Sequence, residues 1–124
     1  MVQTWGSIEE LEEQREDILD FLSELEIEAT PLFFSSAVDT LLLLLGNIIE
    51  HPTEDKYKQI KAENKTYHSN LGRHKTTAKL IKFIGFQSTR LDDNKLAYIY
   101  KHPTGENIPT HPLILITYDE LRTS

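Results

Sequence analysis

The sequence predicts an α+β fold, a helical bundle that carries a small antiparallel β-sheet. Two observations favour this class. As far as residue 84, apolar residues recur every three to four positions, which is the period of a helix with one buried face. After Phe86 the chain consists of short segments rich in Leu, Ile and Tyr between polar loops, which is typical of short strands. A chain of 124 residues, 39% of them hydrophobic, is long enough to bury a core.

The first two helices are predicted from their apolar faces. Ser7 and Glu10 have the spacing of a capping box at the start of the first helix, which we expect to end near Glu26. Pro31 disfavours helix at the residue before it, so the chain breaks there. A second helix, from Ser35 or Ser36 to about residue 49, is apolar over most of its circumference, which predicts the central core helix.

Two more helices are expected in the middle of the chain. The third covers residues 55–71, with Thr53 as its N-cap. The fourth runs from about Lys75 to Ile84 and ends at Gly85, after which Phe86 is placed to pack back on the last turn. The third helix has an unusual apolar stripe, because an amide stands where a leucine is expected: Tyr57, Ile60, Asn64, Tyr67 and Leu71.

The strands are predicted from composition and from the loops between them. Three segments read as short antiparallel strands: "STRL" at 88–91, "LAYIY" at 96–100 and "PLILIT" at 112–117. A long loop at 102–112 precedes the last of them, and the final seven residues read as a frayed end.

The charge distribution suggests two parts. Residues 8–28 hold ten acidic residues and one basic residue, whereas residues 56–82 hold eight basic residues and one acidic residue. The net charge of −7 therefore says little about partners, since the two parts would attract different ones. We expect an acidic N-terminal helix or extension at 1–34 and a main domain at 35–124.

Several classes of function find no support in the sequence. The chain has no cysteine, and its five histidines stand in no metal-binding spacing, so we expect no metal, no cofactor and no catalysis. The longest apolar run, at 41–49, is too short to cross a bilayer and reads as a buried helix. The basic segment gives some support to nucleic-acid binding, but the acidic first helix argues against such a function. A cytoplasmic or nuclear location is expected.

The basic third helix is the best candidate site. On a helix, Tyr57, Lys61 and Asn64 would share a face, with Lys56 beside them. An aromatic ring, two cations and an amide suit a short ligand that carries an apolar side chain and negative charge, such as an acidic peptide end. The alternative is structural: the tyrosine and the amide complete the core, and the lysines are solvated.

The segment "GNIIEHPTEDKYKQIKAENKTYHSNL", followed by "IGFQ", resembles the PUB domain of peptide:N-glycanase and of UBX-domain cofactors. The resemblance covers about residues 36–101. The "GRHKTT" segment at 72–77 and the loop at 102–112 depart from the family pattern. The matching positions are Asn47, Ile48, Pro52, Lys56, Tyr57, Ile60, Lys61, Asn64, Tyr67, Gly85 and Phe86.

The resemblance implies an α+β fold and an adaptor function. PUB domains resemble one another in binding the C-terminal tail of the AAA ATPase valosin-containing protein, whose acidic end finishes in Leu-Tyr-Gly. The implied pathway is ubiquitin–proteasome and ER-associated degradation. If the matching residues have the same roles in this chain, Asn64 would hydrogen-bond the tail backbone, and Lys56 and Lys61 would supply positive charge. Tyr57 and Asn47 would line the pocket, and Gly85 and Phe86 would form its floor or rim.

Two other hypotheses remain open. The chain could be the PUB-like portion of a larger enzyme such as peptide:N-glycanase. It could instead be a helical scaffold whose acidic first helix binds a basic partner while its lysines are inert.

Overall fold

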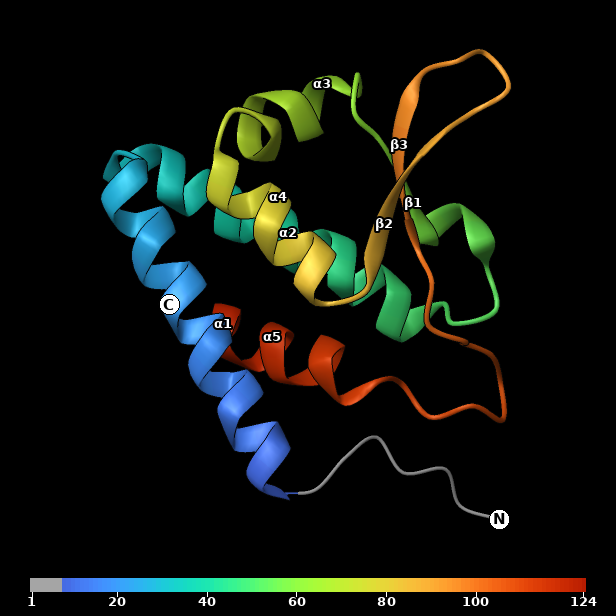
Figure 1. The fold of residues 1–124 in the computed structure, drawn as a ribbon, viewed down its shortest axis with the longest axis horizontal. Coiled ribbons are helices and arrows are strands. Elements are labelled where there is room, and N and C mark those ends of the chain that lie inside the picture. The colour runs from blue at the N-terminus through green and yellow to red at the C-terminus, as the bar shows by residue number, and fades with distance from the viewer. Residues whose placement is uncertain (1–7) are drawn as a thin grey trace.

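A computed structural model describes residues 8–124 and confirms the α+β class (Figure 1). The predicted N-cap Ser7 lies outside the described residues. The main helices are α1 (Ile8–Glu28), α2 (Pro31–Glu50), α4 (Lys75–Phe83) and α5 (Pro112–Arg122). The strands are β1 (Gln59–Lys61), β2 (Phe86–Arg90) and β3 (Leu96–Tyr100), and the short helical elements are η1 (Asp55–Lys58), α3 (Lys65–Tyr67) and η2 (His68–Gly72).

Helix α2 is the central core helix, as predicted. It starts four residues earlier than Ser35, because Pro31 occupies its first turn and the Thr30 hydroxyl accepts the Phe33 N–H at 3.4 Å. Leu41, Leu45 and Ile48 are buried in the core. By length and composition alone α2 could cross a membrane, but this is weak evidence because the central helix of a folded core meets the same criteria.

Helix α1 shares this core. Its residues Ile18, Leu22 and Leu25 are buried in the same hydrophobic cluster as those of α2. At its end, the Glu28 carboxylate accepts the backbone N–H of Lys75 at 2.8 Å, and so caps the start of α4. A hydrogen bond from Thr76 lowers the pKa of Glu28. The boundary expected between residues 34 and 35 falls inside α2.

The single helix predicted over 55–71 is wrong. The segment forms the 3₁₀ turn η1, the strand β1, a turn, and then α3 with η2. Thr53 lies in a turn and caps no helix. Strand β1 alternates exposed, buried, exposed, because successive side chains of a strand point to opposite faces and only Ile60 faces the core. The apolar spacing of three and four residues therefore came from consecutive elements that each place one residue in the core.

The strand predicted at 112–117 is also wrong, and the residues after it are not frayed. They form α5, whose buried residues Leu113, Ile114, Thr117 and Leu121 follow helical spacing. Pro112 starts the helix, and the His111 ring accepts the Leu113 N–H through Nδ1 at 3.1 Å.

The stability of this cap is expected to depend on pH. Burial, together with the stacked His102, lowers the pKa of His111 from 6.5 to about 4. A lowered folded-state pKa means that the unfolded chain takes up the proton first. The free energy of unfolding should therefore fall as pH drops from 6.5 towards 4. Urea unfolding at several pH values in this window measures the slope.

The control for this dependence is His111→Asn, which keeps a capping oxygen but does not titrate. Its stability should fall less steeply with pH than that of the wild type. Equal slopes in the two proteins would contradict a role for His111.

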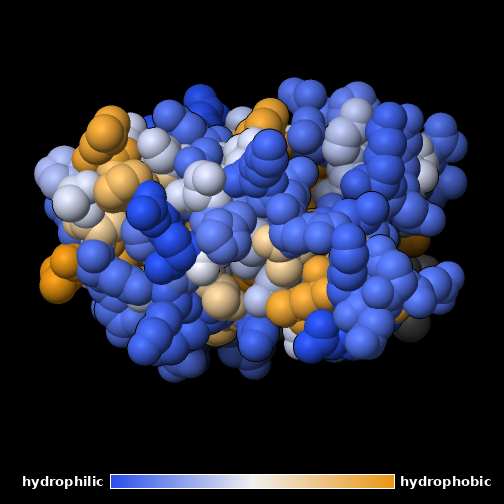
Figure 2. All heavy atoms as spheres, turned by 90° about the horizontal axis from the view of Figure 1, so that it is seen from above, coloured by the Kyte–Doolittle hydropathy of each residue, from blue (hydrophilic) through white to orange (hydrophobic). Residues whose placement is uncertain are grey.

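The three-stranded antiparallel sheet has the order β1-β3-β2. The hairpin β2–β3 and the ending of α4 at Gly85 agree with the prediction, whereas β1 was not foreseen. The face seen in Figure 2 is mostly hydrophilic, with hydrophobic side chains at the left end, where α1 meets α2. Ile27 and Leu32 are among the exposed large apolar residues at this junction.

Candidate functional site

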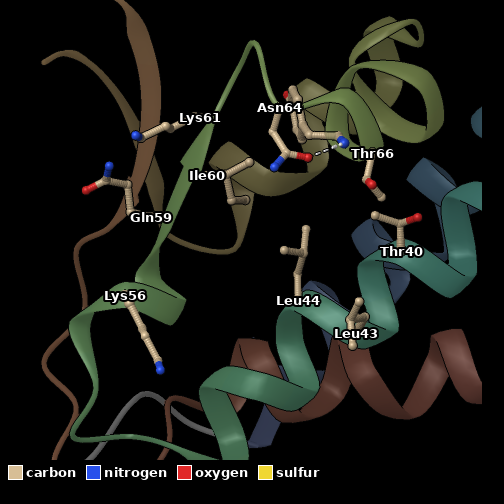
Figure 3. Close-up of a pocket in the computed structure, with 10 residues that line it drawn as sticks. Thr40, Leu43, Leu44, Lys56, Gln59, Ile60, Lys61, Asn64 and Thr66 are labelled. Carbon is tan, nitrogen blue, oxygen red and sulfur yellow. Dashed lines mark hydrogen bonds between the residues drawn. The ribbon is translucent and has the colours of Figure 1, made fainter. Parts of the chain in front are cut away.

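A pocket of about 590 Å³ lies between α2, the η1–β1 segment and α3. Figure 3 shows side chains from α2 on one side of it and those from η1, β1 and the start of α3 on the other. The residues that line it are Thr40, Leu43, Leu44, Lys56, Gln59, Ile60, Lys61, Asn64, Thr66 and Tyr67. It therefore combines apolar, cationic and amide groups.

The apolar part of the pocket comes from three elements. Leu43 and Leu44 lie on α2, and Ile60 lies on β1. Leu43 is 60% exposed, so this side chain is available for contact. Tyr67 is buried and its ring lies 5.8 Å from that of Tyr98. Burial raises the pKa of Tyr67, so its phenol stays neutral near pH 7 and the wall carries no negative charge.

The cationic part consists of Lys56 and Lys61, both exposed. Neither forms an ion pair with any residue in the range 8–124 that the structure describes. Lysines just outside the pocket do: Lys58 pairs with Asp55 at 3.1 Å and Lys95 with Glu63 at 3.1 Å. Residues 8–124 thus leave both lysines unneutralised, with Lys61 projecting to the far side of β1 (Figure 3), and this positive charge favours an anionic ligand.

The side-chain oxygen and nitrogen of Asn64 have different roles. Its Oδ1 accepts the Tyr67 N–H at 3.1 Å, which caps α3 (Figure 3). Its Nδ2 forms no hydrogen bond to the residues that the structure describes. The amide therefore offers a donor to the pocket, and its oxygen explains why an Asn stands in this position at all.

The other predicted site residues do not line this pocket. Asn47 is half-buried on α2. Tyr57 is half-buried too, its ring stacked on His51 at 4.8 Å, with Lys56 above it. Gly85 and Phe86 lie where α4 joins β2, beside Tyr100. The structure therefore brings together Lys56, Lys61 and Asn64 and leaves these four outside the cavity.

Sequence reasoning missed the α2 side of the pocket and the residues between the predicted ones. These are Thr40, Leu43, Leu44, Gln59, Ile60, Thr66 and Tyr67 as pocket-lining residues. One signal was present: α2 is apolar over more of its circumference than a buried face needs, and Leu43 is part of that surplus. Among the described residues, no group of three or more His, Cys, Asp or Glu side chains could hold a metal ion.

The pocket lies in a segment that matches a known protein family. A family model for the PUB domain matches residues 33–112, which include the whole pocket. The chain belongs to the PUB domain family. Two relatives are UBX domain-containing protein 6 of Homo sapiens and that of Bos taurus, each 39% identical over 54 residues. The match covers 44% of this chain and only 12% of either relative.

Membership gives this PUB domain a protein-interaction role of the adaptor kind. The family match ends at residue 112, so α1 and nearly all of α5 lie outside it. Both helices nevertheless pack on the PUB core, since α1 contributes Ile18 and α5 contributes Ile114 to the buried cluster.

Proposed function

We propose that this PUB domain is a non-catalytic adaptor that binds the acidic C-terminal tail of a valosin-containing-protein-like AAA ATPase. The observation that carries the proposal is the pocket, where two lysines and an amide donor that residues 8–124 leave without a partner border apolar side chains. The pathway would be ubiquitin–proteasome and ER-associated degradation, in the cytoplasm or nucleus.

The chemistry of the tail fits the parts of the pocket. Its acidic residues would meet Lys56, with Lys61 adding positive charge from the other side of β1, and its Leu and Tyr side chains would contact Leu44 and Ile60. The Asn64 Nδ2 would donate to a tail carbonyl. A short tail buries little surface and loses its disorder on binding, so we expect a Kd of roughly 1 μM or weaker.

The test is a titration with a fluorescent peptide that has the acidic Leu-Tyr-Gly ending, against wild type and Asn64→Asp. Aspartate keeps the oxygen that caps α3 but removes the amide donor and adds negative charge. The lost hydrogen bond and the repulsion should weaken binding at least about tenfold while the melting temperature changes little. Equal affinity of the two proteins would contradict the role of Asn64, and no binding by the wild type would overturn the proposed partner.

Two variants with the same change in charge distinguish the effect of the pocket on binding from the effect of the protein's net charge. Lys56→Glu and Lys95→Glu change the charge equally, but only Lys56 lines the pocket. We expect the first to weaken peptide binding severalfold and the second to leave it near the wild-type value.

A further inference from the structure

Strand β1 is an edge strand, and its free edge borders the pocket. Within the part of the chain that the structure describes, the sheet order places β3 on one side of β1 and no strand on the other. All three β1 residues line the pocket. Figure 3 shows Ile60 pointing to the space that Leu44 and Asn64 also border, while Gln59 and Lys61 project to the opposite side. An uncovered strand edge presents unpaired backbone groups to any extended chain that reaches it.

The register shows which backbone groups face outward. Ile60 pairs with Tyr98, and two residues on, the Ala62 N–H donates to the Leu96 C=O at 3.0 Å. In an antiparallel pair, hydrogen-bonded residues alternate with residues whose groups point away from the partner. Since Ala62 is hydrogen-bonded to β3, Ile60 is as well, and the groups of Gln59 and Lys61 point to the free edge.

One of these outward groups is already used inside the domain. The Lys61 C=O accepts the Asn64 N–H at 3.0 Å, in the turn that leads to α3. Among the described residues three outward groups remain, namely the Gln59 N–H, the Gln59 C=O and the Lys61 N–H. The Gln59 C=O and the Lys61 N–H lie one on each side of Ile60. In a parallel pair, a single residue of the added strand donates to the first of two such groups and accepts from the second. The edge therefore offers a complete site for one residue of a parallel strand, while the two groups of Gln59 would serve one residue of an antiparallel strand. Lys56 precedes β1, so the parallel direction is the one that places the acidic N-terminal part of the ligand beside a cation.

We propose that the ligand binds as a short fourth strand, parallel to β1, with one of its residues hydrogen-bonded to the Gln59 C=O and the Lys61 N–H. This inference rests on the proposed function and specifies how the tail lies. Parallel pairing places the N-terminal part of the ligand near η1 and its C-terminal part near Asn64. The acidic residues, which precede Leu-Tyr-Gly in the tail, then lie beside Lys56, and the apolar end reaches Tyr67. Adding a strand to a sheet edge is an established mode of peptide recognition.

The first test removes the backbone donor. Proline at position 61 lacks the N–H that faces the free edge, and an edge strand accepts proline where its N–H points outward. The matched control is Lys61→Gln, which also loses the lysine charge but keeps the N–H. We expect Lys61→Pro to bind the tail peptide about tenfold more weakly than Lys61→Gln, the loss of about one hydrogen bond. Equal affinity, with both variants folded by circular dichroism, would overturn the inference.

The second test gives the direction and needs no variant. A nitroxide label is attached to the N-terminus or the C-terminus of the peptide, and amide signals of the ¹⁵N-labelled protein are followed. The parallel strand predicts broadening near Lys56 from the N-terminal label and near Thr66 from the C-terminal label. The reverse pattern would overturn the parallel register while leaving the proposed function intact. Absence of binding would overturn both.

Discussion

Gly85→Ala is expected to destabilise the protein by about 3–5 kcal/mol, through backbone strain and overpacking together. Gly85 has φ of +125°, a conformation that side chains with a Cβ rarely adopt. A Cβ at this position would lie 2.4 Å from His102 Cδ2 and 2.9 Å from Tyr100 Cε1. His102 is stacked on His111, which caps α5, so it has little room to move. Urea unfolding measures the loss.

Gly46→Ala is the matched control. Gly46 lies inside α2, and its added Cβ would meet Tyr118 at an ordinary 3.5 Å. Helix propensity predicts a neutral or stabilising effect of up to about 1 kcal/mol. Because Gly85 does not line the pocket, folded Gly85→Ala protein should bind the tail peptide with near wild-type affinity. Wild-type stability of Gly85→Ala, or selective loss of its binding, would contradict a purely structural role.

Deleting residues 1–29 is expected to unfold the domain, although the remainder contains the whole segment that matches the family. The deletion removes Ile18, Leu22 and Leu25 from the core, each 5% exposed or less. At about 1.5–3 kcal/mol for each buried side chain, the loss is comparable with the total stability of a small domain. It also removes the Glu28 cap of α4 and the contact of Phe21 with Phe83. Circular dichroism and amide-signal dispersion of residues 30–124 provide the measurement.

Point substitutions on α1 test the same claim without truncation. Leu25 is 1% exposed and Leu19 is 41% exposed on the same helix. Leu25→Ala should destabilise by about 2–5 kcal/mol, whereas Leu19→Ala should have a much smaller effect. A well-folded deletion protein would instead support the hypothesis that the acidic helix is a separable interaction segment.

Helices α1, α2 and α4 could be predicted from the spacing of their apolar residues, and Gly85 marked the end of α4 correctly. The spacing of apolar residues could not distinguish one helix from several short elements over residues 55–71. Ile60 lies in a strand and Tyr67 in a helix, yet they stand seven residues apart, which is also the spacing of two helical turns. Asn64 carried a usable signal, since Asn is favoured at helix starts and disfavoured in helix interiors. In the final segment, the His-Pro pair before an apolar run indicated a helix start that composition alone read as a strand.

The candidate site could be predicted only where its residues are local in sequence. Lys56, Lys61 and Asn64 lie within nine residues of one another, and the structure places them around one pocket. Leu43 and Leu44 reach it from α2, and no local pattern says which side of that helix will meet β1. The register that exposes the Gln59 C=O depends on pairing with β3, about forty residues further along the chain.

The hydrogen bond that caps α3 also fixes the orientation of the Asn64 side chain that a ligand would contact. Because the Asn64 oxygen is held by the Tyr67 N–H, a flipped amide would set two donors against each other. The Asn64 Nδ2 is therefore oriented before any peptide arrives, and binding need not freeze that side chain. Such preorganisation lowers the entropic cost of association. The side-chain amide protons of Asn64 should accordingly give sharp, well-separated signals in the free protein.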